Sequence, residues 1–152
     1  MNVMDVYLEN EKRIKNSLAY RTIGCAMKVY SNLGPGLLES VYHKALLIEL
    51  DKQGIHAESE VPINVNYDGI DLGLGFRMDV LVEDMIILEL KSVAAFESIH
   101  YKQISNYLHL TNKPLGYLIN FNVENFQLGK GFEKVINLRY NHKIPEWVYY
   151  DL

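Results

Sequence analysis

Residues 78–93, MDVLVEDMIILELKSV, form the most apolar stretch of the chain and yet contain ionisable side chains. Two apolar runs flank the polar pair at positions 83–84, a pattern that predicts a β-hairpin. Asp79, Glu89 and Lys91 lie inside these runs, where burying a lone charge costs on the order of several kcal/mol. We therefore expect the three side chains to act together as one charged site, and a bound metal ion would explain their presence.

The geometry of a strand brings these charges close together. Successive residues of a strand point to opposite faces, so Glu89 and Lys91 share one face. A tight turn at 83–84 would pair position 79 with 88, whereas a slip or bulge of one residue would bring Asp79 opposite Glu89. Adjacent carboxylates repel unless a cation holds them. Mg²⁺ or Mn²⁺, bound by carboxylates and water, fits such a site.

Lys91 adds a chemical function to the pair of carboxylates. A bound metal ion lowers the pKa of water, and a neighbouring ammonium group orients the nucleophile or stabilises charge on an attacked phosphate. Asp79 followed by Glu89-x-Lys91 is thus suited to metal-assisted hydrolysis of a phosphodiester. The alternative is a structural ion pair at the end of a sheet, since structural pairs also shift pKa values.

Composition sets the class of protein. With 152 residues, 49% hydrophobic and 22% charged, the chain is expected to form a single domain, 1–152, with its own core. The net charge of −4 argues against strong non-specific binding of nucleic acid through bulk charge. It does not exclude a local strip of basic residues.

The sequence also indicates a compartment. Cys25 is the single cysteine, which excludes an internal disulfide and a four-cysteine metal site. Residues 1–16 carry charges throughout and lack the apolar core of a signal peptide. No run approaches the roughly 20 apolar residues of a membrane span. We expect a cytoplasmic protein that does not enter the membrane.

Hydrophobic periodicity predicts a mixed sheet flanked by helices, in the α/β (α+β) class. Expected helices cover 8–31, 37–53 with Gly54 as C′ residue, and 98–112. Expected strands cover 61–67, 72–82, 85–92, 115–121 and 132–140, the last at the sheet margin. The tail at 141–152 has three aromatic residues and either caps the core or joins a partner.

Three motifs resemble those of one nuclease group. Asp79 followed by Glu89-Leu90-Lys91 resembles the metal site of the PD-(D/E)XK nuclease superfamily. GLLESVY at 36–42 fits the G-x-x-E-x-x-Y signature of its GxxExxY family, and QISNY at 103–107 fits the Q-x-x-x-Y motif of its RecB-like branch. The resemblance extends from about residue 18 to 140 and implies a restriction-endonuclease-like core.

The resemblance implies a catalytic set that holds Mg²⁺ or Mn²⁺. Glu39, Asp79 and Glu89 would bind the metal ion, together with the backbone carbonyl of Leu90, and Lys91 would assist catalysis. Glu39 lies on a helical stripe that borders the buried face. It could instead be a solvated glutamate favoured by the helix dipole.

Other residues are expected near the same pocket. Gln103 and Tyr107 lie one helical turn apart and resemble the pair that completes the catalytic set, although both could be ordinary residues at the core edge. Arg77 and Tyr42 are expected to contact the substrate. Met78 stands where the superfamily is named for a proline.

These patterns predict a metal-dependent nuclease that hydrolyses phosphodiester bonds of nucleic acid, DNA rather than RNA. The alternative is a non-catalytic module that binds nucleic acid or protein and retains the nuclease fold. Superfamily members that cut both strands often form dimers, so the resemblance is compatible with a homodimer. It is also compatible with an unidentified protein partner.

Overall fold

The computed structural model describes residues 1–151, apart from the side chain of Leu74. Within this range the chain forms a five-stranded sheet in the order β1-β2-β3-β4-β5. The elements are α1 (Val3–Asn16), α2 (Leu18–Leu33), α3 (Glu39–Lys52), β1 (Ala57–Tyr67), β2 (Ile70–Val82), β3 (Ile86–Lys91), α4 (Ser98–Thr111), β4 (Leu115–Asn120) and β5 (Phe132–Ile136). β3 and β4 are parallel, whereas the other neighbouring strands are antiparallel. The predicted mixed sheet flanked by helices is confirmed.

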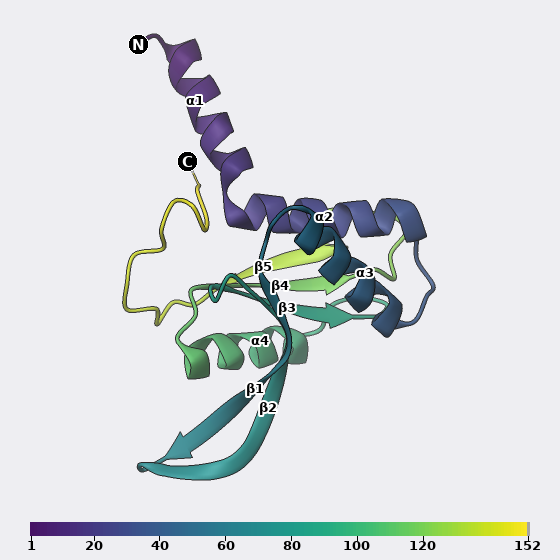
Figure 1. Ribbon diagram of the computed structural model, residues 1–152, viewed down its shortest axis with the longest axis vertical. Coiled ribbons are helices and arrows are strands. Elements are labelled where there is room, and N and C mark those ends of the chain that lie inside the picture. Colours follow the sequence, from purple (N-terminus) through teal and green to yellow (C-terminus); the bar gives the residue numbers. More distant parts are fainter. Residues whose placement is uncertain (152) are drawn as a thin grey trace.

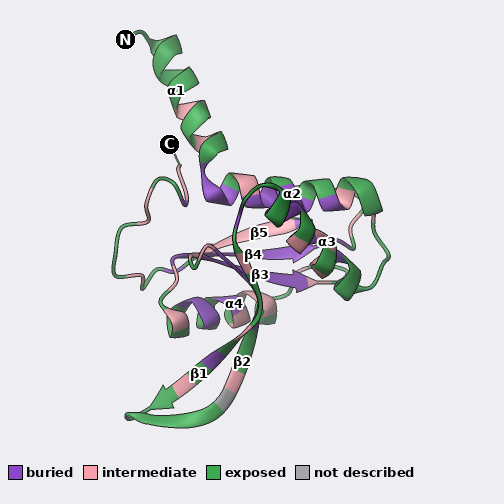
Figure 2. Ribbon diagram, viewed as in Figure 1, coloured by how far each residue is buried: buried purple, intermediate pink, exposed green. Residues whose placement is uncertain are grey.

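Helices cover both faces of the sheet (Figure 1). α2 and α3 pack on one face, where Leu46 and Leu50 join the larger core cluster. α4 packs on the other face, where Ile104 and Leu108 join the second cluster. β3 and β4 lie between these layers and are buried along most of their length (Figure 2). Such strands read as continuous apolar runs, as parallel strands covered on both faces do.

The helix predicted over 8–31 is two helices, because the chain turns at Ser17. The Ser17 hydroxyl donates to the Ile14 carbonyl at 2.7 Å and accepts from the Tyr20 amide at 3.4 Å, so it caps both helices. α1 buries none of its residues and projects away from the sheet (Figures 1 and 2). None of the helices within residues 1–151 combines the length and apolarity that crossing a membrane requires.

The C-terminal tail closes the core beside α2. The carbonyls of Trp147 and Val148 accept hydrogen bonds from the first two amides of α2, at 2.7 and 2.8 Å. The Val148 side chain is fully buried in the larger core cluster. Of the two roles expected for the tail, the structure therefore supports the cap on the core.

Several element boundaries differ from those predicted. β1 begins at Ala57 rather than 61, since its first residues pair with the end of β2. β5 does form an edge of the sheet but ends at Ile136 rather than 140. It stops there because the Asn137 amide group bonds the carbonyls of Leu108 and Lys113. The predicted C′ position of Gly54, with φ of 68°, is confirmed.

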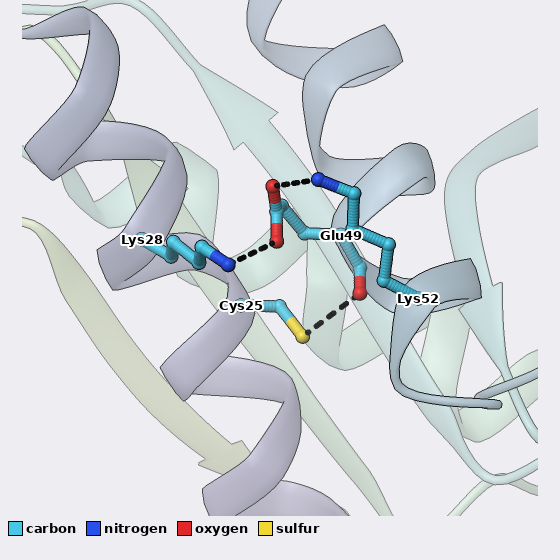
Figure 3. A network of polar contacts seen from close by, with 4 residues as sticks. All are labelled: Cys25, Lys28, Glu49 and Lys52. Atoms are coloured by element: carbon cyan, nitrogen blue, oxygen red, sulfur yellow. Dashed lines mark hydrogen bonds and ion pairs between the residues drawn. The ribbon is translucent and has the colours of Figure 1, made fainter.

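A buried carboxylate connects α2 to α3 and was not predicted from the sequence. Glu49 is buried between these helices and forms ion pairs with Lys28 and Lys52, each at 3.4 Å (Figure 3). The Cys25 thiol donates to the Glu49 carbonyl at 3.6 Å. These contacts tie α3, whose first turn borders the candidate site, to α2.

Candidate active site

The β2–β3 hairpin sets the register of the candidate site. Val80 pairs with Leu88, and continuing that register places Asp79 opposite Glu89. Residues 83–85 form the turn, in which Glu83 and Asp84 adopt positive φ, 49° and 58°. The longer turn shifts the pairing by one residue, so the slipped register is the one observed.

Asp79 and Glu89 are joined through backbone amides. The Asp79 amide donates to Glu89 Oε1 at 3.2 Å, and the Leu90 amide donates to Asp79 Oδ2 at 2.7 Å. Glu89 is only 3% exposed. Burial, and then the negative charge of Asp79, raise the pKa of Glu89 to about 8. Without a cation, the Glu89 carboxyl therefore keeps its proton at neutral pH.

A chain of hydrogen bonds runs from Lys91 to α4. The Lys91 ammonium donates to Gln103 Oε1 at 3.0 Å, and Gln103 Nε2 donates to the Tyr107 hydroxyl at 2.9 Å. Burial, followed by the negative charges of Glu89 and Asp79, raises the pKa of Tyr107. The Tyr107 hydroxyl thus stays protonated and lies near the carboxyl groups of Glu89 and Asp79.

The loop before α3 determines where Glu39 lies. Gly36 adopts φ of 95°, which favours glycine. The Tyr42 hydroxyl donates to the Gly34 carbonyl at 2.6 Å and accepts from the Leu37 amide at 3.0 Å. These bonds hold the loop against α3, so that the helix begins at Glu39.

Glu39 lies close enough to Asp79 for the charge of that residue to change its pKa. Glu39 is exposed as a whole, yet partial burial of its carboxyl group and the charge of Asp79 raise its pKa, while Lys91 and His43 lower it. The Glu39 carboxyl group therefore lies within the field of Asp79 and Lys91.

The donor atoms suit a hard divalent ion. Among residues 1–151, no three histidine, cysteine or acidic side chains are already grouped to hold a metal ion. Asp79 and Glu89 do bring carboxylate oxygens together, with Glu39 nearby. The amide and carbonyl of one strand residue point to the same side, so the Leu90 carbonyl faces the Asp79 side of β3. Oxygen donors of this kind fit Mg²⁺ or Mn²⁺.

Tyr42 and Arg77 are not joined to this arrangement. Tyr42 is 1% exposed and its ring stacks on Phe121 with centroids 4.5 Å apart. The prediction that Tyr42 contacts the substrate is therefore wrong, because this side chain is buried and holds the loop before α3. Arg77 is exposed and forms a surface pair with Glu60 at 3.9 Å, which contributes little to stability.

Asn120 was missed by the sequence analysis. This buried residue ends β4 beside Lys91 in the register of the parallel pair. Its side chain bonds the Val93 amide at 3.3 Å and the Val93 carbonyl at 2.8 Å. It thereby fixes the chain just after Lys91. A polar residue at the end of the apolar strand YLIN was the signal available in the sequence.

Residues 16–135 match the PD-(D/E)XK nuclease superfamily. The chain belongs to this superfamily. The mixed sheet with helices on both faces agrees with the expected restriction-endonuclease-like fold of the superfamily. Among solved structures, the chain is similar to SSO0001, with a TM-score of 0.49 and 20% sequence identity over 64% of this chain. The match spans 50% of that structure's chain. No curated protein sequence matches this superfamily member.

Proposed function

We propose that this superfamily member is a Mg²⁺- or Mn²⁺-dependent nuclease that hydrolyses phosphodiester bonds of nucleic acid, with DNA as the preferred polymer. One observation carries the proposal: the half-buried Asp79 and the buried Glu89 lie beside an ammonium group that is held by a hydrogen-bonded glutamine. A structural ion pair would not need a second, buried carboxyl group whose pKa is raised.

We assign the chain to the GxxExxY family in the RecB-like branch. The loop geometry supports this assignment, since Gly36 makes the turn, Tyr42 holds it and Glu39 begins the helix towards the carboxylates. The bond between Gln103 and Tyr107 supports the second motif.

In this proposal Asp79, Glu89 and Glu39 hold the metal ion, with the Leu90 carbonyl as a further ligand. When bound, the cation neutralises the carboxylates, lowers the pKa of water and stabilises charge on the attacked phosphate. The carboxylate oxygens orient the site and accept hydrogen bonds from the backbone, which limits their movement.

Lys91 acts on the phosphate or on the attacking water. Gln103 accepts one of its three ammonium hydrogens, so the other hydrogens remain to bond a phosphate oxygen or to orient the water. Tyr107 fixes the Gln103 amide and so acts as a positioning residue. Aligning the ammonium group before reaction reduces the reorganisation needed in the transition state.

A cleavage assay tests the proposal. Wild type, Glu89→Gln and the control Glu58→Gln would be incubated with labelled single-stranded, duplex and branched DNA and with RNA, in Mn²⁺ or EDTA. Glu58 is an exposed carboxylate on β1, where it lies opposite Leu81 and contacts His56 rather than Asp79 or Glu89. We expect wild type and the control to cleave in Mn²⁺ only, and Glu89→Gln to lose at least 100-fold in rate, as expected when a transition-state electrostatic contact is removed.

Two outcomes would overturn the nuclease proposal. Equal cleavage by Glu89→Gln would place the activity elsewhere. Absence of cleavage of every polymer by the wild type, with nucleic-acid binding intact, would support the non-catalytic module instead, a role that agrees with the net charge of −4.

A further inference from the structure

A groove lies between β2 and α4, next to the candidate site. Its volume is about 420 Å³, within the usual range of small-ligand pockets. Gln103 and Tyr107 form part of its wall, and both belong to the hydrogen-bond chain that ends at Lys91. Whatever occupies this groove therefore lies beside the proposed catalytic residues.

The groove offers a ready aromatic surface. Phe76 lies three residues before Asp79 on β2, and its side chain is 49% exposed. Its ring packs against Tyr107 with centroids 5.5 Å apart and planes inclined by 42°. Ile99, 61% exposed, also lines the groove. Because Tyr107 already orders the Phe76 ring, stacking another ring on it would require little loss of side-chain freedom.

Polar groups complete the lining. Asn106 and Lys102 lie exposed on α4 at the same groove. An amide side chain both donates and accepts hydrogen bonds, so it suits the edge of any nucleobase. An ammonium group attracts phosphate. An apolar ring face, an amide and a cation together match the face of a nucleobase, its polar edge and the phosphate attached to it.

The hairpin that carries Phe76 does not suit a duplex laid along it. β1 and β2 extend as an arm beyond the body of the protein (Figure 1). Its exposed charges include four acidic residues, Glu58, Glu60, Asp68 and Asp71, which repel a phosphate backbone. Bases in a duplex are stacked on one another and cannot reach Phe76 unless they are extruded.

We propose that this groove binds an unpaired base, stacked on Phe76, and so directs the adjoining phosphate to the Lys91 and carboxylate site. The preferred substrate is then single-stranded nucleic acid or the frayed end of a duplex. This inference rests on the proposed nuclease function for its meaning, but base binding itself can be measured without cleavage.

The test uses full-length protein carrying Glu89→Gln, so that no strand is cut during measurement. A single-stranded DNA with one 2-aminopurine reports stacking through fluorescence quenching, and its anisotropy reports Kd. Phe76→Ala should weaken binding roughly 10-fold and remove the quenching, as base–aromatic stacking predicts. Phe76→Tyr should retain both, because the ring remains.

Two further variants separate stacking from other effects. Tyr67→Ala removes another exposed aromatic residue from the same arm, 73% exposed, and should leave Kd and quenching unchanged. Phe76→Leu keeps an apolar group against Tyr107 and should still lose the quenching. Circular dichroism would verify that each variant is folded.

The outcomes distinguish this inference from the proposed nuclease activity. Quenching that is unchanged in Phe76→Ala and Phe76→Leu would overturn the proposal that the groove binds a base, even if the wild type cleaves DNA. If Phe76→Ala weakened the binding of single-stranded DNA and of fully paired duplex equally, the proposal of an unpaired base in the groove would also be overturned. Quenching that depends on Phe76, in a wild type that cleaves nothing, would uphold the groove and reject the nuclease.

Discussion

At the scale of single residues, Glu89 is a carboxyl group whose position costs the metal-free protein stability once the group ionises. It is buried beside Asp79, and its pKa is raised accordingly. Ionising it in the metal-free protein is unfavourable, because burial and like charge both oppose the anion. A bound divalent cation would reverse that preference.

The stability of the metal-free protein should therefore fall as pH rises. Between the ordinary pKa of 4.5 and the folded value of about 8, the folded state holds more protons on Glu89 than the unfolded state does. The contribution of the protonated Glu89 carboxyl to the unfolding free energy is fully present below pH 4.5 and is lost by pH 8. The loss is on the order of a few kcal/mol. Urea unfolding in EDTA, comparing wild type with Glu89→Gln across this range, measures it.

Other groups titrate alike in both proteins, so the difference between the two curves isolates Glu89. We expect the unfolding free energy of Glu89→Gln to increase relative to that of the wild type as pH rises. We also expect Mn²⁺ at pH 8 to stabilise the wild type more than the variant. Parallel curves across pH 4.5–8 would contradict the buried, raised carboxyl group.

Tyr42 has a structural role that can be measured separately. Tyr42→Phe retains the stack on Phe121 but removes both hydroxyl bonds to the loop at 34–37. We expect unfolding free energy to fall by about 1–3 kcal/mol, and Mn²⁺ affinity to fall because Glu39 is held less firmly. Tyr20→Phe, at an exposed position on α2, is the control. Unchanged stability and metal affinity would show that the loop does not depend on the hydroxyl.

At the scale of elements, α4 must pack closely on the sheet to bring Gln103 and Tyr107 to Lys91. Gly116 permits this approach. A Cβ at this position would lie 2.7 Å from Ile104 Cδ1 and 3.1 Å from the Ile87 carbonyl oxygen. Ile104 is fully buried, so it has little room to move.

Gly116→Ala should therefore displace α4 and weaken the fold. We expect a loss of about 1–3 kcal/mol in unfolding free energy, as overpacking predicts, and slower cleavage because the bond from Lys91 to Gln103 lengthens. Gly24→Ala, inside α2, is the control for adding a methyl group without a clash, since a Cβ there meets no atom within 4 Å, and helix propensity predicts a gain of about 0.5–1 kcal/mol. Equal stability of Gly116→Ala and the wild type would indicate that α4 adjusts without cost.

At the scale of the whole molecule, the two ends of the described chain contribute differently. Residues 1–9 are all exposed, whereas Val148 is fully buried and the tail carbonyls cap α2. The stability of the body thus depends on a segment distant in sequence from the helix it caps, and little on the beginning of α1.

Deleting residues 1–9 should change unfolding free energy by less than about 0.5 kcal/mol. Val148→Ala should lower it by about 1–3 kcal/mol through a cavity in the core. Thermal and urea unfolding at several protein concentrations compare the two variants with the wild type. A large, concentration-dependent loss on deletion would mean that α1 packs against a second copy in solution.

The amino-acid sequence was enough to predict the succession of strands and helices from β1 to β5, the start of α4 and the shared face of Glu89 and Lys91. These features follow from local periodicity and turn residues, which neighbouring positions alone specify. The motifs also identified the superfamily. The break at Ser17, the slipped pairing that places Asp79 opposite Glu89, and the burial of Glu49 became known from the folded structure. The pairing depends on the exact length of a turn, which residue types alone left undetermined. The start of α2 at the break is capped by Trp147 and Val148, and Glu49 pairs with Lys28 on another helix, so both features depend on partners that a local pattern does not contain.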